Sequence, residues 1–208
     1  MEDGTIIQVV KNTKLMLINR GFDEALINTT LPVGYLKEFI KKFRNGDPCL
    51  DIFVQDTDDN RCVYVHFINE LKKSDNAGLL EKMYHITSES HSMTENDAVV
   101  FVILSDINEN TQEQFNELEN KIPNITIFKY KSLMFNLIDH EYIPKHERIS
   151  EKNMEKLKLD LMINDLEKLP IIHKTDAVCR YYNFKPGDVI KVTRDSLNKK
   201  HIAYRYVV

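Results

Sequence analysis

The stretch DAVVFVIL, residues 97 to 104, constrains the fold more than any other part of the sequence. A nearly unbroken apolar run rich in valine is typical of a β-strand that is covered on both faces. An amphipathic helix is predicted after it, over residues 111–121, and a second β-rich stretch follows at 125–130. Strand, helix and strand in this order form a βαβ-like unit, so the first part of the chain is predicted to be α/β.

Two helices are predicted near the start of the chain. Residues 4–21 place apolar side chains on one face, and Gly21 suits the left-handed conformation that ends many helices. Residues 31–46 form the second helix, in which Tyr35, Phe39 and Phe43 are expected to share a face. Two β-rich stretches, 49–55 and 61–67, flank the turn cluster DTDDN and predict a hairpin. The stretch LLEKMYHI after it is predicted to be helical.

The last third of the chain predicts a different, α+β arrangement. Ser150 is a candidate N-cap for a helix whose apolar face holds Met154, Leu157 and Leu161. Asp176 is a candidate cap for a short helix through Tyr182, and Pro186-Gly187 predict a turn. Residues 189–194 and 201–208 alternate in polarity and predict an antiparallel strand pair.

Charge also divides the chain into two parts. Residues 136–208 carry 14 Lys/Arg against 11 Asp/Glu, a net charge of +3, and residues 1–135 carry 14 against 21, a net charge of −7. We therefore expect two domains, 1–135 and 136–208, with different surfaces. The total of −4 argues against a generally basic nucleic-acid binder. No signal-peptide pattern, long apolar run or disulfide framework is present, so we expect a soluble protein of a reducing compartment.

The residues that could carry catalysis or hold a metal lack the patterns these functions need. DTDDN begins like a calcium-binding loop, but Arg61 stands where that loop needs glycine. The three cysteines and seven histidines form no ligand cluster at short spacing, so no metal and no cofactor is expected. Cys179 is expected to be a buried or half-buried apolar residue. Six glycines in the whole chain leave no glycine-rich phosphate-binding motif.

Asp51 is the one acid that suggests nuclease chemistry. Some nucleases place an aspartate on a strand and a Glu-x-Lys pair on the next strand to hold Mg²⁺. The following stretch here, RCVYVHF, offers neither acid nor lysine. A single carboxylate does not assemble such a metal clamp, so we expect no nuclease activity.

The segment around the short helix after Asp176 concentrates tyrosine and charge. Arg180, Tyr181, Tyr182, Lys185, Asp188, Lys191 and Arg194 all fall within it. Tyrosine and arginine are enriched at the cores of protein interfaces, which favours a docking surface. A packed helix-turn-strand with ordinary surface charge explains the same residues, and the sequence leaves both interpretations open.

The same segment carries a resemblance to a known family. LPIIHKTDAVCRYYNFKPGDVIKVTR, with YRYVV near the end, resembles the C-terminal domain of the fifth shared subunit of eukaryotic nuclear RNA polymerases, which has a counterpart in archaeal RNA polymerase. DHEYIPKH, which begins at Asp139, is similar to that family's E-H-E-L-V-P-E-H. The resemblance covers about residues 136–208. Ala177, Cys179 and Asn183 depart from the family pattern, although Asn183 still tolerates the left-handed conformation that ends the helix.

The resemblance implies a non-catalytic subunit of a multisubunit DNA-directed RNA polymerase, with a C-terminal assembly domain that docks on the largest subunit. The partner-binding residues it implies are His140, Glu141, Pro144, His146, Asp176, Arg180, Tyr181, Tyr182, Lys185, Gly187 and Arg194. It implies an N-terminal α/β domain of nuclease-like fold in the lower jaw, near downstream duplex DNA. Weak, non-specific contacts are expected there from Lys41, Lys42 and Arg44, and neither a membrane partner nor a homo-oligomer is expected.

The degree of divergence and the Asn/Lys/Ile-rich character resemble the version encoded by a large cytoplasmic DNA virus such as African swine fever virus. That origin implies viral gene transcription in the host cytoplasm and a place in the virion, whereas a cellular origin implies the nucleus. The alternative function from another class is a divergent nuclease-like DNA-binding protein that acts outside the polymerase. A third is a free-standing adaptor for a transcription regulator.

Overall fold

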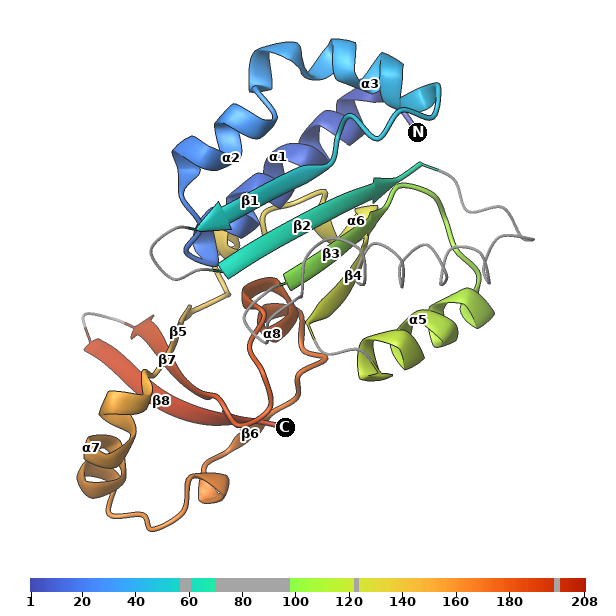
Figure 1. Ribbon diagram of the computed structural model, residues 1–208. Helices are drawn as coiled ribbons and strands as arrows, with labels where there is room; N and C mark the ends of the chain where they lie inside the picture. The colour runs from blue at the N-terminus through green and yellow to red at the C-terminus, as the bar shows by residue number, and fades with distance from the viewer. Residues whose placement is uncertain (57–60, 70–97, 122–123, 197–198) are drawn as a thin grey trace. The chain divides into compact units, whose positions relative to one another are not determined.

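The computed structural model describes residues 1–56, 61–69, 98–121, 124–196 and 199–208. These residues form two compact units, Met1–Phe135 and Asn136–Val208, each with its own four-stranded mixed sheet (Figure 1). Helices and strands are mixed in both units, which agrees with the α/β (α+β) prediction. None of the helices in these ranges combines the length and apolar character that a membrane crossing requires.

The first unit is built on a sheet with the strand order β1-β2-β3-β4. Its strands are β1 (Ile52–Asp56), β2 (Arg61–Ile68), β3 (Ala98–Ile103) and β4 (Ile125–Lys129). β1 and β2 are antiparallel, which confirms the predicted hairpin, and β3 is parallel to both of its neighbours. Its helices are α1 (Asp3–Asn19), α2 (Glu24–Thr30), α3 (Leu36–Arg44), α5 (Glu109–Lys121) and α6 (Tyr130–Leu133), with a 3₁₀ turn η1 (Val33–Tyr35).

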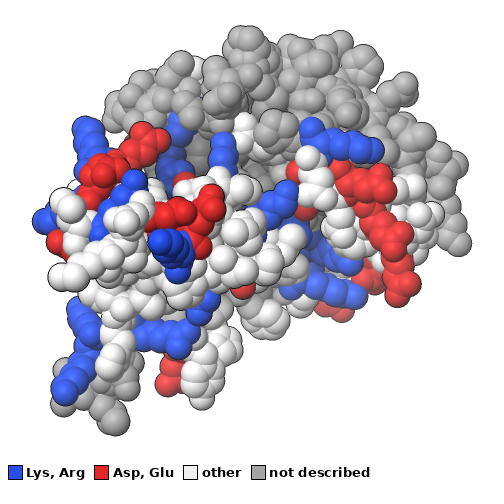
Figure 2. Space-filling model, turned by 90° about the horizontal axis from the view of Figure 1, so that it is seen from below, with Lys and Arg blue, Asp and Glu red and all other residues white. Residues whose placement is uncertain are grey.

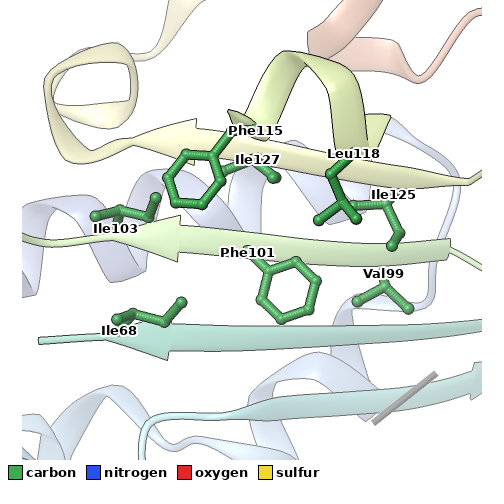
Figure 3. Close-up of a cluster of buried hydrophobic side chains, with 8 residues drawn as sticks. All are labelled: Ile68, Val99, Phe101, Ile103, Phe115, Leu118, Ile125 and Ile127. Atoms are coloured by element: carbon green, nitrogen blue, oxygen red, sulfur yellow. The ribbon is translucent and has the colours of Figure 1, made fainter. Parts of the chain in front are cut away.

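Every residue of β3 is buried, as the apolar run predicted. On one face, Val99, Phe101 and Ile103 pack with Phe115 and Leu118 of α5 (Figure 3). Val100 and Val102 point to the opposite face and are fully buried as well; α1, α2 and α3 lie on that side of the sheet in Figure 1. The strand–helix–strand sequence β3-α5-β4 confirms the predicted βαβ-like unit.

The helical start of the chain differs from the prediction in two places. α2 was not predicted from the sequence; its N-cap Asp23 accepts hydrogen bonds from the backbone N–H groups of Ala25 and Leu26. α3 begins only at Leu36, and its buried face is Leu36, Ile40 and Phe43. The prediction that Tyr35 belongs to this face is therefore wrong, since Tyr35 precedes the helix and is 60% exposed.

The second unit is built on the strand order β5-β7-β8-β6. The strands are β5 (Lys145–Arg148), β6 (Ile171–Ile172), β7 (Val189–Ser196) and β8 (Lys199–Val207). β6 runs parallel to β8, and the other neighbours are antiparallel. The helical elements are η2 (Leu137–Asp139), α7 (Glu151–Leu161), η3 (Leu166–Lys168) and α8 (Ala177–Tyr182).

Ser150 occupies the N-cap position of α7, but its side chain makes no capping hydrogen bond. Only Leu157 of the predicted apolar face is buried. Two predictions concern residues outside the described ranges: the helix LLEKMYHI and most of the DTDDN turn.

Candidate protein-docking surface

The helix-turn-strand segment from Asp176 to Arg194 folds as the sequence predicts. Asp176 Oδ1 accepts a hydrogen bond of 2.8 Å from the backbone N–H of Val178, which caps α8. Asn183 ends the helix in the left-handed conformation with φ of 57°, and Gly187 turns the chain with φ of 96°. These positions suit asparagine and glycine because both residues tolerate positive φ.

The turn after α8 is tied to the strand that follows and to the end of the chain. The backbone N–H of Lys185 donates to Asp188 Oδ2 at 2.8 Å. The N–H of Gly187 donates to the carbonyl of Val207 at 3.0 Å, and the N–H of Val207 donates to the carbonyl of Asp188 at 2.9 Å. These bonds fix the angle at which β7 leaves the helix, so the residues of α8 and β7 keep constant positions relative to each other.

The two tyrosines of α8 have different environments. Tyr181 is 3% exposed, and its hydroxyl group donates to Asn136 Oδ1 at 3.0 Å. Tyr182 is half-buried, and its ring stacks on Phe184 with 5.2 Å between centroids. Burial raises the pKa of Tyr182, so its hydroxyl stays neutral at ordinary pH. Tyr182 can contact a partner directly, whereas Tyr181 is a core residue that supports it from behind.

Cys179 lies in the core under the helix with Ile190, Val192 and Val207. Burial, with a smaller contribution from nearby Asp176 and Asp188, raises the pKa of its thiol to about 12. A thiol with such a pKa is almost entirely protonated at neutral pH and is a poor nucleophile. The expectation of an apolar role for Cys179 is therefore confirmed.

The remaining partner-binding residues predicted from the resemblance are spread over this unit. His140 and Glu141 are exposed in the loop before β5, and the His140 ring lies 5.7 Å from that of Tyr142. Arg194 is exposed on β7, whereas Arg180 and Lys185 are half-buried and already engaged in contacts within the chain. The structure thus places several of these residues at the surface of one unit, and sequence order alone could not establish this.

His146 is half-buried on β5, and its ring Nδ1 lies 2.7 Å from the carbonyl oxygen of Pro144. Burial is the largest influence on its pKa and lowers it, and the positive charges of Arg194 and Arg205 act in the same direction. Asp176 and the Pro144 carbonyl oppose this effect. These influences place His146 close to the charged groups of α8, β7 and β8.

Asp51 of the first unit has no carboxylate partner for a metal among the described residues. Its Oδ2 accepts a 2.6 Å hydrogen bond from the hydroxyl of Tyr64 and lies 2.6 Å from Nδ1 of His66. Its Oδ1 accepts a bond from the backbone N–H of Phe67 at 3.1 Å. Three neighbours therefore occupy this carboxylate, and burial together with Asp51 raises the pKa of Tyr64. Asp51 could be singled out from the sequence, whereas Tyr64 and His66 were not predicted as its partners, although both fall on the predicted neighbouring strand.

The basic residues expected near DNA lie on α3. Lys41, Lys42 and Arg44 are all exposed. Arg44, however, binds within the chain: its Nη2 lies 2.5 Å from Asp3 Oδ1 and 2.7 Å from the carbonyl of Met1. In the view of Figure 2, basic and acidic side chains are interspersed over short distances. Within the ranges that the structure describes, no group of three His, Cys, Asp or Glu side chains could hold a metal ion.

Comparison with known proteins gives the family. Residues 135–207 match the model of "RNA polymerase Rpb5, C-terminal domain". The chain is 40% identical over 77 residues to the DNA-directed RNA polymerase subunit Rpo5 of Archaeoglobus fulgidus, a match covering 36% of this chain and 100% of the archaeal protein. Rpo5 of Sulfurisphaera tokodaii is 41% identical over 70 residues, 33% of this chain and 82% of that protein. The chain belongs to the RNA polymerase Rpb5 family.

A plant relative extends the comparison only slightly. Subunit 5B of DNA-directed RNA polymerases IV and V from Arabidopsis thaliana is 33% identical over 84 residues, 40% of this chain. The match spans only 38% of the plant protein's own length. The Rpb5 family match thus coincides with the second unit. This unit contains the capped helix α8, the hydrogen-bonded turn that follows it, and Tyr182.

Proposed function

We propose that this chain is a non-catalytic subunit of a multisubunit DNA-directed RNA polymerase. The observation that carries the proposal is that 77 residues of this chain match the entire length of an archaeal Rpo5 protein, while the family model matches residues 135–207, nearly the whole second unit. Because this module alone forms a complete polymerase subunit in archaea, it would not need the first unit in order to act as a polymerase subunit. The thiol of Cys179 is a poor nucleophile because its pKa is raised, and the Asp51 carboxylate is already hydrogen-bonded within the chain. Both observations favour a role in assembly over a role in catalysis.

The second unit would dock on the largest polymerase subunit. A half-exposed aromatic residue on a rigid helix suits an interface because little conformational entropy is lost when it is buried. Tyr182, stacked on Phe184 and backed by Tyr181, has this character. Arg194, His140 and Glu141 are exposed in the same unit and would supply further polar contacts to the partner. Asp176 and Gly187 would act indirectly, by fixing the helix and the turn.

The first unit would form part of the lower jaw near downstream duplex DNA, with a nuclease-like fold that has lost its chemistry. Its sequence carries a net charge of −7, which weakens any grip on phosphates. Lys41 and Lys42 of α3 are exposed and would make weak, non-specific contacts. Arg44 would contribute less because it already binds Asp3. If the chain is of viral origin, it would serve viral transcription in the host cytoplasm and the virion; otherwise it would serve in the nucleus.

Affinity purification of the tagged full-length chain from its native cells, with identification of partners, tests this proposal. The largest polymerase subunit is expected to co-purify in stoichiometric amount, and fractionation of the same cells locates the complex. Tyr182→Ala should reduce co-purification several-fold, whereas Tyr35→Ala should not, since it removes an exposed tyrosine from the other unit. A chain that purifies free of polymerase contradicts the proposal.

The rival function, a nuclease-like DNA-binding protein outside the polymerase, predicts a different result. The purified chain would then cleave labelled DNA in the presence of Mg²⁺ or Mn²⁺, and Asp51→Asn would abolish the cleavage. We expect no cleavage by either protein, because the hydroxyl of Tyr64, His66 and the Phe67 N–H already fill the carboxylate of Asp51.

A further inference from the structure

The outer side of β8 is an open strand edge. On one side, β8 pairs with β7 from Lys199 to Tyr206. On the other side, β6 pairs only with Tyr206 and Val207. Within the described part of the chain, no strand covers this side of β8 from Lys199 to Arg205. Seven residues in extended conformation span about 23 Å, which is long for an unprotected edge.

The direction of the backbone groups along this edge follows from the bonds at its end. The N–H of Tyr206 donates outward to the carbonyl of Pro170, and the N–H of Val207 donates inward to Asp188. Backbone groups of alternate residues point to the same side of a strand. Tyr204, Ile202 and Lys200 therefore direct both their N–H and their C=O groups outward, like Tyr206.

The side chains along the edge are basic at its ends and apolar in its middle. Lys199, Lys200 and His201 are exposed, and Arg205 is half-buried. Ile202 between them is 52% exposed, which is unusual for isoleucine on a sheet. Residues 189–208 carry five Lys/Arg and one Asp, so the hairpin is the most basic part of the unit. Arg194 lies opposite His201 in the strand register and adds to this charge.

We propose that an extended acidic segment of a partner polypeptide adds to β8 as a further strand. This inference rests on the proposed function, because it names the kind of segment through which the polymerase holds this unit. Main-chain hydrogen bonds to Lys200, Ile202 and Tyr204 provide affinity. Glutamates or aspartates of the segment meet Lys200, His201 and Arg205, and an apolar residue covers Ile202.

A polypeptide fits this edge better than a nucleic acid does. The outward groups of β8 are alternating donors and acceptors. A second strand satisfies both kinds, whereas phosphate groups are acceptors only and leave the carbonyl oxygens of Ile202 and Tyr204 without partners. The basic charge alone suits both classes, so the backbone pattern decides between them.

The test uses the purified full-length chain and a panel of fluorescent peptides of about nine residues that alternate glutamate with valine, isoleucine or threonine. Binding is measured by fluorescence anisotropy. For each binding peptide, two N-methylated forms are made: one carries methyl groups on the nitrogens that face β8, the other on the alternate nitrogens. We expect at least about a tenfold loss of affinity for one form only, because it loses two or more hydrogen bonds.

Variants of the chain provide the second measurement. Ile202→Pro removes an outward N–H that β7 does not use, and proline is tolerated on edge strands. Ile202→Ala keeps that N–H and is the matched control. We expect peptide binding to fall about tenfold more for Ile202→Pro than for Ile202→Ala, with unchanged circular dichroism. Should Ile202→Pro not fold, the N-methylated peptides decide the question alone.

Three outcomes overturn the inference: no peptide of the panel binds, both N-methylated forms bind equally, or a single-stranded oligonucleotide of the same charge displaces the peptide and binds more tightly. If the inference fails while the tagged chain still co-purifies with polymerase, the proposed function stands and docking uses another surface. If the chain purifies without polymerase but binds the peptides in the expected register, the open edge serves another partner.

Discussion

Replacing Tyr181 tests whether the helix α8 is anchored by a core residue. Its ring is 3% exposed, so Tyr181→Ala removes nearly all of its packing and is expected to cost about 3–5 kcal/mol. The second unit has 73 residues, from Asn136 to Val208. A domain of this size has a stability of roughly 4–11 kcal/mol. Tyr181→Ala therefore consumes a large share of that stability and leaves much of the unit unfolded in water or mild denaturant.

Tyr181→Phe separates the hydroxyl from the ring. It keeps the packing and loses one hydrogen bond to Asn136, worth about 1 kcal/mol. With a urea dependence of about 1 kcal/mol per M, the unfolding midpoint should fall by about 1 M. Urea denaturation followed by circular dichroism and tyrosine fluorescence measures both variants, since the chain has no tryptophan. A Tyr181→Ala midpoint within about 0.5 M of the parent would refute the reasoning.

Three further predictions concern other buried groups. Asp51→Ala should destabilise the first unit by about 3 kcal/mol in denaturation, because three donors lose their acceptor, and Asp51→Asn should cost less. With a thiol pKa of about 12, Cys179 should resist a thiol reagent at pH 8 until urea is added, so that at most two of the three thiols react in the folded chain. Burial lowers the pKa of His146, so the unfolded state binds the extra proton and stability should fall as the pH drops below about 6.5; His146→Gln should flatten this part of a melting-temperature profile.

The parts of the fold that could be predicted are those in which a local backbone or burial requirement is met by only a few residue types. A seven-residue apolar run rich in valine, residues 98–104, is typical of a strand covered on both faces, and β3 is such a strand. Asp176, Asn183 and Gly187 each meet a backbone need, as a cap or at positive φ, that few other residues meet. Such signals are local, so they do not depend on knowing the remainder of the structure.

The features that were missed depend on tertiary contacts. β5 reads KHER, a polar sequence without strand propensity, and it is extended because it pairs with β7 from Ile190 to Thr193. The burial of Tyr181 but not of Tyr182 depends on which side of α8 meets the sheet. α2 is different, because Asp23, followed by Glu24 and then Ala25, Leu26 and Ile27, is a local capping signal that the sequence does contain.

The candidate docking surface could be located from the sequence, but its chemistry could not. The resemblance indicated the segment from Asp176 to Arg194, and the structure assigns its members to different tasks: Cys179 and Tyr181 to the core, Asp176 and Gly187 to backbone geometry, Tyr182 to the surface. A family motif contains residues of all these kinds. Losing a residue that holds the fold disrupts docking as much as losing one that touches the partner, so the motif does not distinguish the two. Only burial separates them.

That separation changes how the interface must be studied. Replacing both tyrosines by alanine is expected to weaken assembly whether or not either side chain touches the partner, since loss of the buried Tyr181 alone destabilises the unit that presents Tyr182. Tyr182 and the open edge of β8 can be changed while the buried ring of Tyr181 stays in place. A docking defect in Tyr182→Ala or Ile202→Pro, with the unfolding midpoint preserved, therefore reports on the interface itself, and the two together distinguish an aromatic anchor from strand addition.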